Sequence, residues 1–244
     1  MGSTAKRVGL VTGANKGIGL EIARQLAQAG VCVIIGARDA ERGRAAVADL
    51  NSQGLAVAFV HLDLVDEASI AAAAATISDE HGRLDILVNN AGIVDWTDGV
   101  PSRASLQAVR RVFATNFFGT LAVTQAMLPL LRKSTAARIV NLSSSLGSLA
   151  LNGDPSSPYY SAQLMGYNAS KAALNMLTVQ LSEELRGTPH VVNSVSPGYA
   201  KTDLTGGNGF LTPDQAAKTP VRFALLADDA VSGRFVETEG EIGW

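Results

Sequence analysis

Short apolar runs alternate with longer amphipathic stretches along most of the chain. The runs that predict strands lie at 7–12, 31–36, 56–61, 84–88, 138–142, 191–195 and 234–236. The stretches that predict helices lie at 17–29, 39–51, 67–78, 105–114, 117–131, from about 161 or later to 186, and 212–226. Short, mostly apolar strands separated by helices are typical of a parallel sheet that is covered on both faces.

This order of elements predicts the fold class. Right-handed crossovers between parallel strands produce a doubly wound, Rossmann-like α/β fold with about seven strands and helices on both faces. No linker, internal repeat or low-complexity segment interrupts the pattern. We therefore expect residues 1–244 to form a single domain.

Composition and charge narrow the classes of function. The net charge is −2, and no basic run suits nucleic acid. The single cysteine, Cys32, lies in an apolar run, which favours a buried packing role over a reactive one. The three histidines lie far apart, so we expect no metal site. No signal segment or run of membrane-spanning length is present, which predicts a cytoplasmic protein without membrane contacts.

A glycine-rich turn follows the first predicted strand. Gly13, Gly17 and Gly19 stand where the strand passes into a helix. Glycines allow a tight turn and close packing, and the free N–H groups at a helix start can bind a pyrophosphate. The spacing G-x-x-x-G-x-G differs from the G-x-G-x-x-G of many dinucleotide-binding folds. Taken alone, it is a moderate signal for a nucleotide site.

Basic residues near this turn bear on the choice of dinucleotide. Lys16 precedes the second glycine, and Arg38 follows the second predicted strand. A basic side chain at the latter position suits a 2′-phosphate, whereas an acidic one accepts from a ribose hydroxyl. Asp39 is the acidic alternative, but the helical segment that follows it predicts a helix cap. The sequence therefore favours NADPH over NADH, with Arg42 as a weaker contributor.

A tyrosine and a lysine stand four positions apart in the longest predicted helix. On a helix, Tyr167 and Lys171 would share one face. A cation there favours the phenolate and would lower the pKa of the tyrosine towards neutrality. Such pairs also occur by chance on many helices. Tyr159 and Tyr160 are alternative acids, but neither has a lysine four positions later.

Further motifs accompany this pair in a fixed order, and they are Asn89-Asn90-Ala91-Gly92, Asn116, Ser144 and Pro197-Gly198. With Thr12–Gly19 they make the chain resemble the short-chain dehydrogenase/reductase family over nearly its whole length. Within that family the chain is most similar to the NADPH-dependent carbonyl reductases, through residues 13–20, 37–39 and 197–199. The resemblance implies a single NADP-binding domain.

The resemblance also implies roles for matching residues. Tyr167 would donate the proton to the carbonyl oxygen, Lys171 would lower its pKa and hold the nicotinamide ribose, and Ser144 would hydrogen-bond the substrate. Asn116 would kink its helix and hold a water in a proton relay, and Asp63 would meet the adenine amino group. The cofactor contacts expected in full are Gly13, Asn15, Lys16, Gly17, Ile18, Gly19, Arg38, Asp63, Leu64, Asn90, Ala91, Gly92, Tyr167, Lys171, Pro197, Gly198 and Thr202.

The implied activity is the NADPH-dependent, reversible reduction of a ketone or aldehyde to an alcohol. A non-catalytic NADP-binding sensor or scaffold of the same fold, and an alcohol dehydrogenase working oxidatively, remain as alternatives. The residues expected to line the substrate pocket are Ile93, Val94, Trp96, Ser145, Leu146, Tyr160, Tyr199, Leu204 and Phe210. This lining suits an aryl or medium-length aliphatic carbonyl compound.

Two features complicate the match to the family. Three serines are consecutive at 143–145, and the family pattern Val140–Ser144 favours the second as the catalytic one. The stretch from Ser144 to Tyr167 is longer than is usual in the family, and its extra part near 152–160 is rich in turn formers. The longest carbonyl reductases carry a still larger insertion here and are monomeric. We therefore expect a monomer or homodimer rather than the family's common tetramer.

Overall fold

The computed structural model describes residues 6–227 and 230–244. The strands in these residues are β1 (Val8–Thr12), β2 (Cys32–Ala37), β3 (Val57–His61), β4 (Ile86–Asn89), β5 (Arg138–Leu142), β6 (Val191–Val195), β7 (Phe235–Glu237) and β8 (Gly240–Glu241). The α-helices in the same residues are α1 (Gly17–Gln28), α2 (Ala40–Ser52), α3 (Glu67–His81), α4 (Leu106–Phe113), α5 (Thr120–Leu131), α6 (Leu149–Gly153), α7 (Met165–Glu184) and α8 (Pro213–Ala224). A π-helical turn, η1 (Ala114–Gly119), and two 3₁₀ turns, η2 (Ser145–Gly147) and η3 (Asp203–Thr205), complete the described elements.

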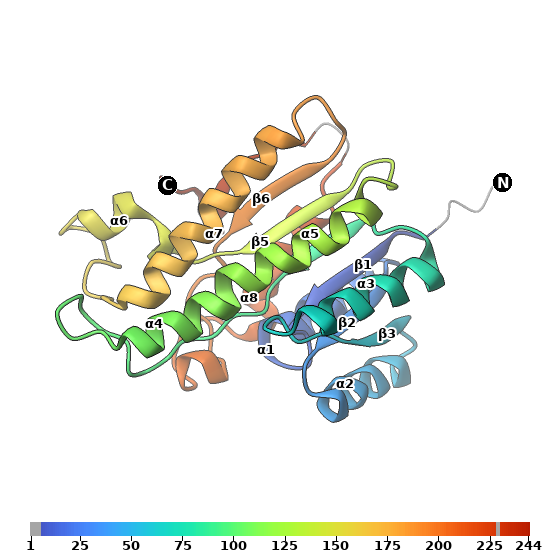
Figure 1. Cartoon of the computed structure of the whole chain (residues 1–244), viewed down its shortest axis with the longest axis horizontal. Coiled ribbons are helices and arrows are strands. Elements are labelled where there is room, and N and C mark those ends of the chain that lie inside the picture. The colour runs from blue at the N-terminus through green and yellow to red at the C-terminus, as the bar shows by residue number, and fades with distance from the viewer. Residues whose placement is uncertain (1–5, 228–229) are drawn as a thin grey trace.

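One sheet runs through the centre of the molecule (Figure 1). Its strand order is β3-β2-β1-β4-β5-β6-β7-β8, and the pairs are parallel except for the last, β7–β8. The expected doubly wound α/β fold is confirmed. The sheet has one strand more than expected, because the chain turns back after Glu237 and adds β8 in antiparallel register.

Neighbouring side chains of each central strand point to opposite faces of the sheet. On β1, Leu10 packs into the core beneath α3, α5 and α7, whereas Val11 packs into the core beneath α1, α2 and α8. Figure 1 shows α3, α5 and α7 together on the near face of the sheet. The two helix layers leave the carboxyl ends of the strands at one edge, where the candidate site lies. No helix in the described residues is long and apolar enough to cross a membrane.

Most helices begin where a local polar side chain can cap them. The Asp39 carboxylate accepts from the N–H of Arg42 at 3.0 Å, so the predicted cap of α2 is confirmed. Asp66 caps α3 in the same way, and the Ser105 hydroxyl caps α4. An N-cap side chain satisfies one of the N–H groups that have no partner inside the helix.

The longest helix starts later than the earliest position that the sequence allowed. α7 begins at Met165, and its N-cap residue, Leu164, has no side chain able to cap it. The stretch before it contains the short helix α6 and a series of turns that ends near 162. The position of this helix start therefore depends on contacts from elsewhere in the chain, which are described below.

Candidate active site

The candidate site lies at the carboxyl ends of β1, β4, β5 and β6. The strand order reverses between β1 and β4, and ligands of open α/β sheets bind at such a crevice. The glycine-rich turn after β1, the segment after β4 and the serine turn after β5 all converge here. This arrangement brings together residues that are far apart in the sequence.

The glycine turn fits tightly against the segment after β4. Gly13 has a φ of +64°, and a Cβ atom on it would lie 2.9 Å from the Cα of Ala91. A Cβ on Gly19 would overlap the amide of Asn90, which donates to the carbonyl of Thr12 at 2.8 Å. Only glycine allows this close approach. Asn90 thus holds the turn in place through its side chain.

The start of α1 remains open to a ligand. Lys16 is its N-cap residue, and among the described residues no side-chain cap accepts a hydrogen bond from the first turn. The first N–H groups of a helix lack intrahelical partners and carry the positive end of its dipole. Their position beside a glycine turn with Gly17 at a φ of +59° suits a pyrophosphate. The residues present therefore fit a dinucleotide cofactor.

The basic residues predicted for a 2′-phosphate have different surroundings. Arg38 is exposed at the end of β2, and its guanidinium has no hydrogen bond or ion pair with any residue that the structure describes. Lys16 instead forms an ion pair with Asp203, with 2.6 Å between Nζ and Oδ2. The hydrogen bond from Lys16 lowers the pKa of Asp203, and the charge of Arg42 adds to this. Arg38 is thus available to bind a phosphate, whereas Lys16 would have to bind it while paired with the Asp203 carboxylate.

Asp63 and Leu64, two other expected cofactor contacts, follow β3. One oxygen of Asp63 accepts from the N–H of Val65 at 3.1 Å, and its own N–H donates to the Ser69 hydroxyl. The carbonyl of Leu64 packs against Gly119, where a Cβ would lie 2.5 Å from it. Both residues thus stand on a fixed turn beside η1, and their contact with a cofactor stays a prediction.

Tyr167 and Ser144 meet at the centre of the site. Tyr167 is 8% exposed, and burial raises the pKa of its phenol to about 12, while a hydrogen bond with Ser144 opposes the rise. The Ser144 hydroxyl oxygen accepts from the N–H of Leu146 at 3.2 Å, so its own proton remains able to donate. Two O–H donors thus lie within hydrogen-bonding reach of each other.

Lys171 lies one helical turn beyond Tyr167 on the buried face of α7. Its Nζ donates to the carbonyl of Leu142 at 2.7 Å and lies 5.7 Å from the centre of the Tyr167 ring. Burial lowers the pKa of Lys171 to about 8. The pKa of the Tyr167 phenol is raised above its usual value and not lowered as the sequence predicted, because burial of the phenol is the largest cause.

Asn116 lies inside the π-helical turn η1, and the expected kink of its helix stays a prediction. Its side-chain NH₂ donates to the carbonyl of Ile93 at 3.0 Å and to the Ser170 hydroxyl at 3.1 Å, and its oxygen accepts from the N–H of Ile93. A Cβ on Gly92 would lie 3.4 Å from the Asn116 oxygen and 3.5 Å from Lys171 Nζ. Asn116 therefore stands beside the lysine, and its relay water stays a prediction.

The three consecutive serines point to different partners. The Ser143 hydroxyl lies 3.5 Å from the carbonyl of Lys171, and both groups are buried. The Ser145 hydroxyl donates to Glu237 at 2.8 Å, and Ser196 donates to the same oxygen at 2.7 Å. Of these three serines, Ser144 is the one whose hydroxyl bonds to the Tyr167 phenol. This geometry supports the choice of the second serine.

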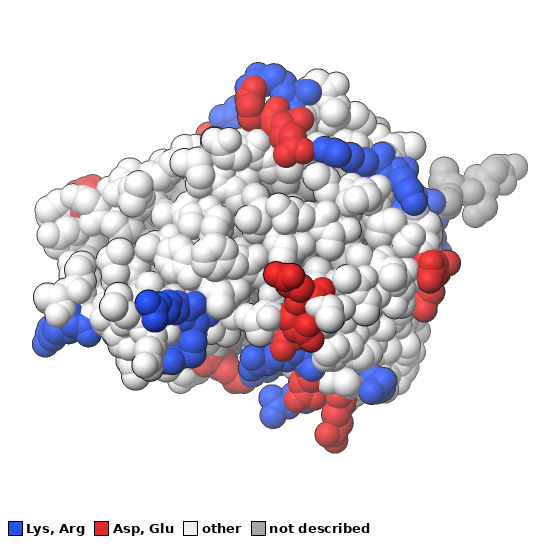
Figure 2. All heavy atoms as spheres, in the orientation of Figure 1, with Lys and Arg blue, Asp and Glu red and all other residues white. Residues whose placement is uncertain are grey.

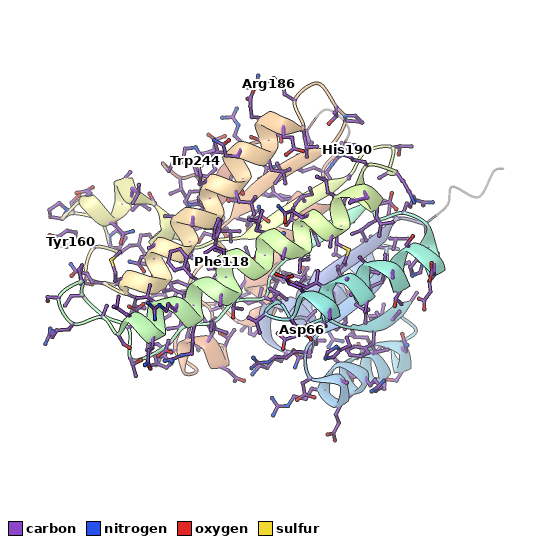
Figure 3. The ribbon with its side chains drawn as sticks, in the orientation of Figure 1. Asp66, Phe118, Tyr160, Arg186, His190 and Trp244 are labelled. Atoms are coloured by element: carbon purple, nitrogen blue, oxygen red, sulfur yellow. The ribbon has the colours of Figure 1, made fainter. Side chains whose placement is uncertain are left out.

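Aromatic residues predicted for the pocket lie on loops around this centre. Tyr199 and Phe210 form an edge-to-face pair with 5.7 Å between ring centres, and Phe210 is 87% exposed. Trp96 is 68% exposed on the segment after β4. Tyr160 lies at the outer end of the molecule beside α6 (Figure 3), whereas its neighbour Tyr159 donates to Glu237 at 3.1 Å. Their contact with a substrate stays a prediction.

Other pocket and cofactor residues lie closer to the glycine turn. Gly198 has a φ of +79° directly after β6, and Thr202 lies within 3.6 Å of a Cβ built on Gly17. The segment that includes Pro197 and Leu204 therefore passes over the start of α1. This places the end of β6 beside the phosphate turn, as the family motif implies.

Comparison with known proteins identifies the family of this chain. The family model described as short chain dehydrogenase matches residues 7–209. The chain belongs to this family. It is similar to carbonyl reductase (NADPH) 1 of Sus scrofa, with 35% identity over 280 residues that cover 99% of this chain and 96% of the relative.

Solved structures of short-chain dehydrogenases resemble the molecule as a whole. NADPH-bound carbonyl reductase from chicken fatty liver has 32% identity and a TM-score of 0.85, covering 98% of this chain and 99% of that one. Salutaridine reductase from Papaver somniferum has 31% identity and a TM-score of 0.81, covering 94% and 99%. The predicted family resemblance is confirmed.

Three acidic residues contact the site of this short-chain dehydrogenase and were not found from the sequence. Asp203 pairs with Lys16, Glu237 joins Ser145 to the extra segment, and Asp98 binds the start of α7. No spacing pattern marks them, because each approaches its partner across a large separation in sequence. Only the folded chain shows these contacts.

Proposed function

We propose that the chain reduces a ketone or aldehyde to an alcohol with NADPH, and that Tyr167 donates the proton. The observation that carries this proposal is the hydrogen bond between Tyr167 and Ser144 at the crevice of the sheet, with Lys171 buried beside them. Two neighbouring hydroxyl groups that can both donate suit an oxygen on which negative charge develops. NADPH, when bound, supplies the hydride for the carbonyl carbon.

Tyr167 acts as the acid in this scheme. With a pKa of about 12, its phenol is fully protonated at neutral pH and can give a proton to the oxygen of the reacting carbonyl. Ser144 donates a second hydrogen bond to the same oxygen. In the reverse, oxidative direction the same group would act as the base in its phenolate form.

Lys171 supports the acid as a buried cation. With a pKa of about 8 it is mostly charged at pH 7, and a positive charge near the phenol favours proton release as the reaction proceeds. Its Nζ lies close to Gly92, on the path expected for the nicotinamide ribose. Asn116 holds Ile93 and Ser170 around this cation, which fixes the lysine's surroundings.

The proposed cofactor is NADPH, held at its 2′-phosphate by Arg38 and in part by Lys16. The Arg38 guanidinium has no ion pair within the described part of the chain, which supports this choice, and Asp39 is already used as a helix cap. A panel of aryl and aliphatic ketones and aldehydes, followed by the loss of NADPH absorbance, tests the activity. Cofactor binding without turnover of any carbonyl would favour a sensor or scaffold instead.

We also propose that the protein is a monomer or homodimer. The segment between Ser144 and Tyr167 is longer than usual, and it folds with α6 beside the start of α7, one of the helices used in the family's tetramer interface (Figure 1). Figure 2 shows few charged side chains on the middle of the face formed by α5 and α7, which is compatible with a single two-fold contact. A stable tetramer by light scattering at micromolar concentration would refute this proposal.

A further inference from the structure

The first turn of α7 requires hydrogen-bond partners from outside the helix. Its first three N–H groups belong to Met165, Gly166 and Tyr167, and such groups have no acceptor within a helix. The N-cap residue Leu164 supplies none through its side chain. The first bond of the helix itself is that from the N–H of Asn168 to the carbonyl of Leu164.

A distant loop supplies all three acceptors. The two carboxylate oxygens of Asp98 accept from the N–H of Gly166 at 3.0 Å and from that of Tyr167 at 2.9 Å. The carbonyl of the next residue, Gly99, accepts from the N–H of Met165 at 2.9 Å. Residues 98 and 99 thus complete the cap of a helix that begins more than sixty positions later in the chain. The capped turn includes Tyr167, the proposed proton donor.

The loop that carries Asp98 is itself held firmly. Asp95 accepts from the N–H and the hydroxyl of Thr97, and these bonds with the nearby Arg111 lower the pKa of Asp95 to about 2. Arg111 lies on α4 and pairs with Asp95 at 2.6 Å. The loop is therefore tied to α4 independently of its contact with α7.

The helix start also fits its neighbours without spare room. A Cβ on Gly166 would lie 3.0 Å from the Cα of Val109 and 3.1 Å from a carboxylate oxygen of Asp98. A side chain at this position would push α7 away from both α4 and Asp98. The glycine before Tyr167 thus permits the contact that Asp98 makes.

We propose that Asp98 is a positioning residue for Tyr167, a proposal that rests on the function assigned above. Its carboxylate binds the backbone N–H of Tyr167 itself and so fixes where the first turn of α7, and with it the phenol, stands relative to Ser144. A displacement of about 1 Å in a reacting group can cost a hundredfold in rate. The negative charge also complements the positive end of the helix dipole.

The decisive variant is Asp98→Ala, measured in the full-length protein with a carbonyl substrate that the wild type reduces. We expect kcat to fall about tenfold or more, because the Tyr167 phenol is no longer held in position relative to Ser144. The dissociation constant for NADPH should stay unchanged, since the phosphate turn is untouched. The primary deuterium isotope effect on kcat, measured with deuterated NADPH, should increase as the chemical step becomes slower.

Asp98→Asn keeps one acceptor oxygen and should give an intermediate kcat with a folded protein. The matched control is Asp66→Ala, which removes a carboxylate cap from α3, a helix that carries no proposed catalytic group (Figure 3). The thermal stability of Asp66→Ala should fall about as much as that of Asp98→Ala, with an unchanged kcat and isotope effect. This pair separates lost positioning from lost stability.

Unchanged kcat and isotope effect in Asp98→Ala would overturn the proposal, as would an equal loss of kcat in Asp66→Ala. Hydrogen exchange gives a second readout that does not depend on turnover. The N–H groups of residues 165–167 should exchange faster in Asp98→Ala, and unchanged protection would contradict the assigned cap. A wild type that binds NADPH but reduces no carbonyl would instead contradict the proposed function.

Discussion

Two helices in this protein begin at the site, and their first turns differ in how their N–H groups are used. α1 starts after a glycine turn and leaves its first N–H groups without a side-chain cap. α7 starts with all three groups bound, two by Asp98 and one by the carbonyl of Gly99. The same backbone chemistry therefore serves a ligand in one place and a fixed side chain in the other.

The difference follows from what each helix must hold. The open start of α1 can give its hydrogen bonds and its dipole to a phosphate group. At the closed start of α7, the N–H groups and the dipole interact with Asp98 and Gly99 instead. These contacts immobilise the helix that carries Tyr167 and Lys171. Binding and proton transfer thus depend on separate helix starts, and each can be changed with limited effect on the other.

The sharpest test of this separation is Tyr167→Phe. It removes the proton donor and leaves the ring and the cap of α7 in place. We expect carbonyl reduction to fall by about 10²–10⁴-fold, the usual contribution of a general acid, with the dissociation constant for NADPH unchanged. Steady-state rates and fluorescence titration of NADPH check both parts. Near-wild-type turnover would rule out Tyr167 as the acid.

The converse test changes cofactor binding and leaves the acid intact. Arg38→Asp should raise the KM for NADPH about tenfold or more through loss of a charge-assisted contact. The KM for NADH should stay the same or fall, because an aspartate accepts from a free ribose hydroxyl. Arg44→Asp is the matched control, since Arg44 lies on α2 over the ring of Phe59. Equal KM changes in the two variants would make Arg38 an ordinary surface charge.

Lys171 serves both regions, because it lies beside Tyr167 and on the path expected for the cofactor, and its titration should affect the rate. Burial lowers its pKa to about 8, so the cation is present below that pH and is lost as the pH rises through it. The kcat/KM for reduction should therefore decline above pH 8 with little change below 7. Lys171→Arg keeps a charge at all these pH values. Its kcat/KM should be lower than that of the wild type but should not decline above pH 8. A pH profile with the same decline in both proteins would assign it to another group.

The smallest expected effect concerns the pair between Lys16 and Asp203. Asp203→Asn releases Lys16 for the 2′-phosphate, so the KM for NADPH should fall, while that for NADH stays unchanged. The pair is exposed to water, and such pairs contribute little. The gain should shrink in high salt, which screens the contact. An increase in the KM for NADPH would show that Asp203 helps cofactor binding instead.

Local sequence patterns predicted the open start of α1 and the fold around it. Gly13, Gly17 and Gly19 specify a turn that only glycine allows, and the apolar strands specify a parallel sheet. Asp39 could be assigned as a cap because it lies next to the helix it serves. Tyr167 and Lys171 could be paired because one helical turn separates them. All of these features depend on neighbours within a few residues along the chain.

Three features depend on contacts between distant segments: the start of α7, the ion pair of Lys16 and the pKa of Tyr167. Asp98 caps a helix from a loop far earlier in the chain, and Asp203 approaches Lys16 from beyond β6. The pKa of Tyr167 rises because folding removes the phenol from water, and a nearby cation in the sequence says nothing of that burial. Contacts between distant segments and the loss of solvent arise only when the whole chain packs, so no local pattern encodes them.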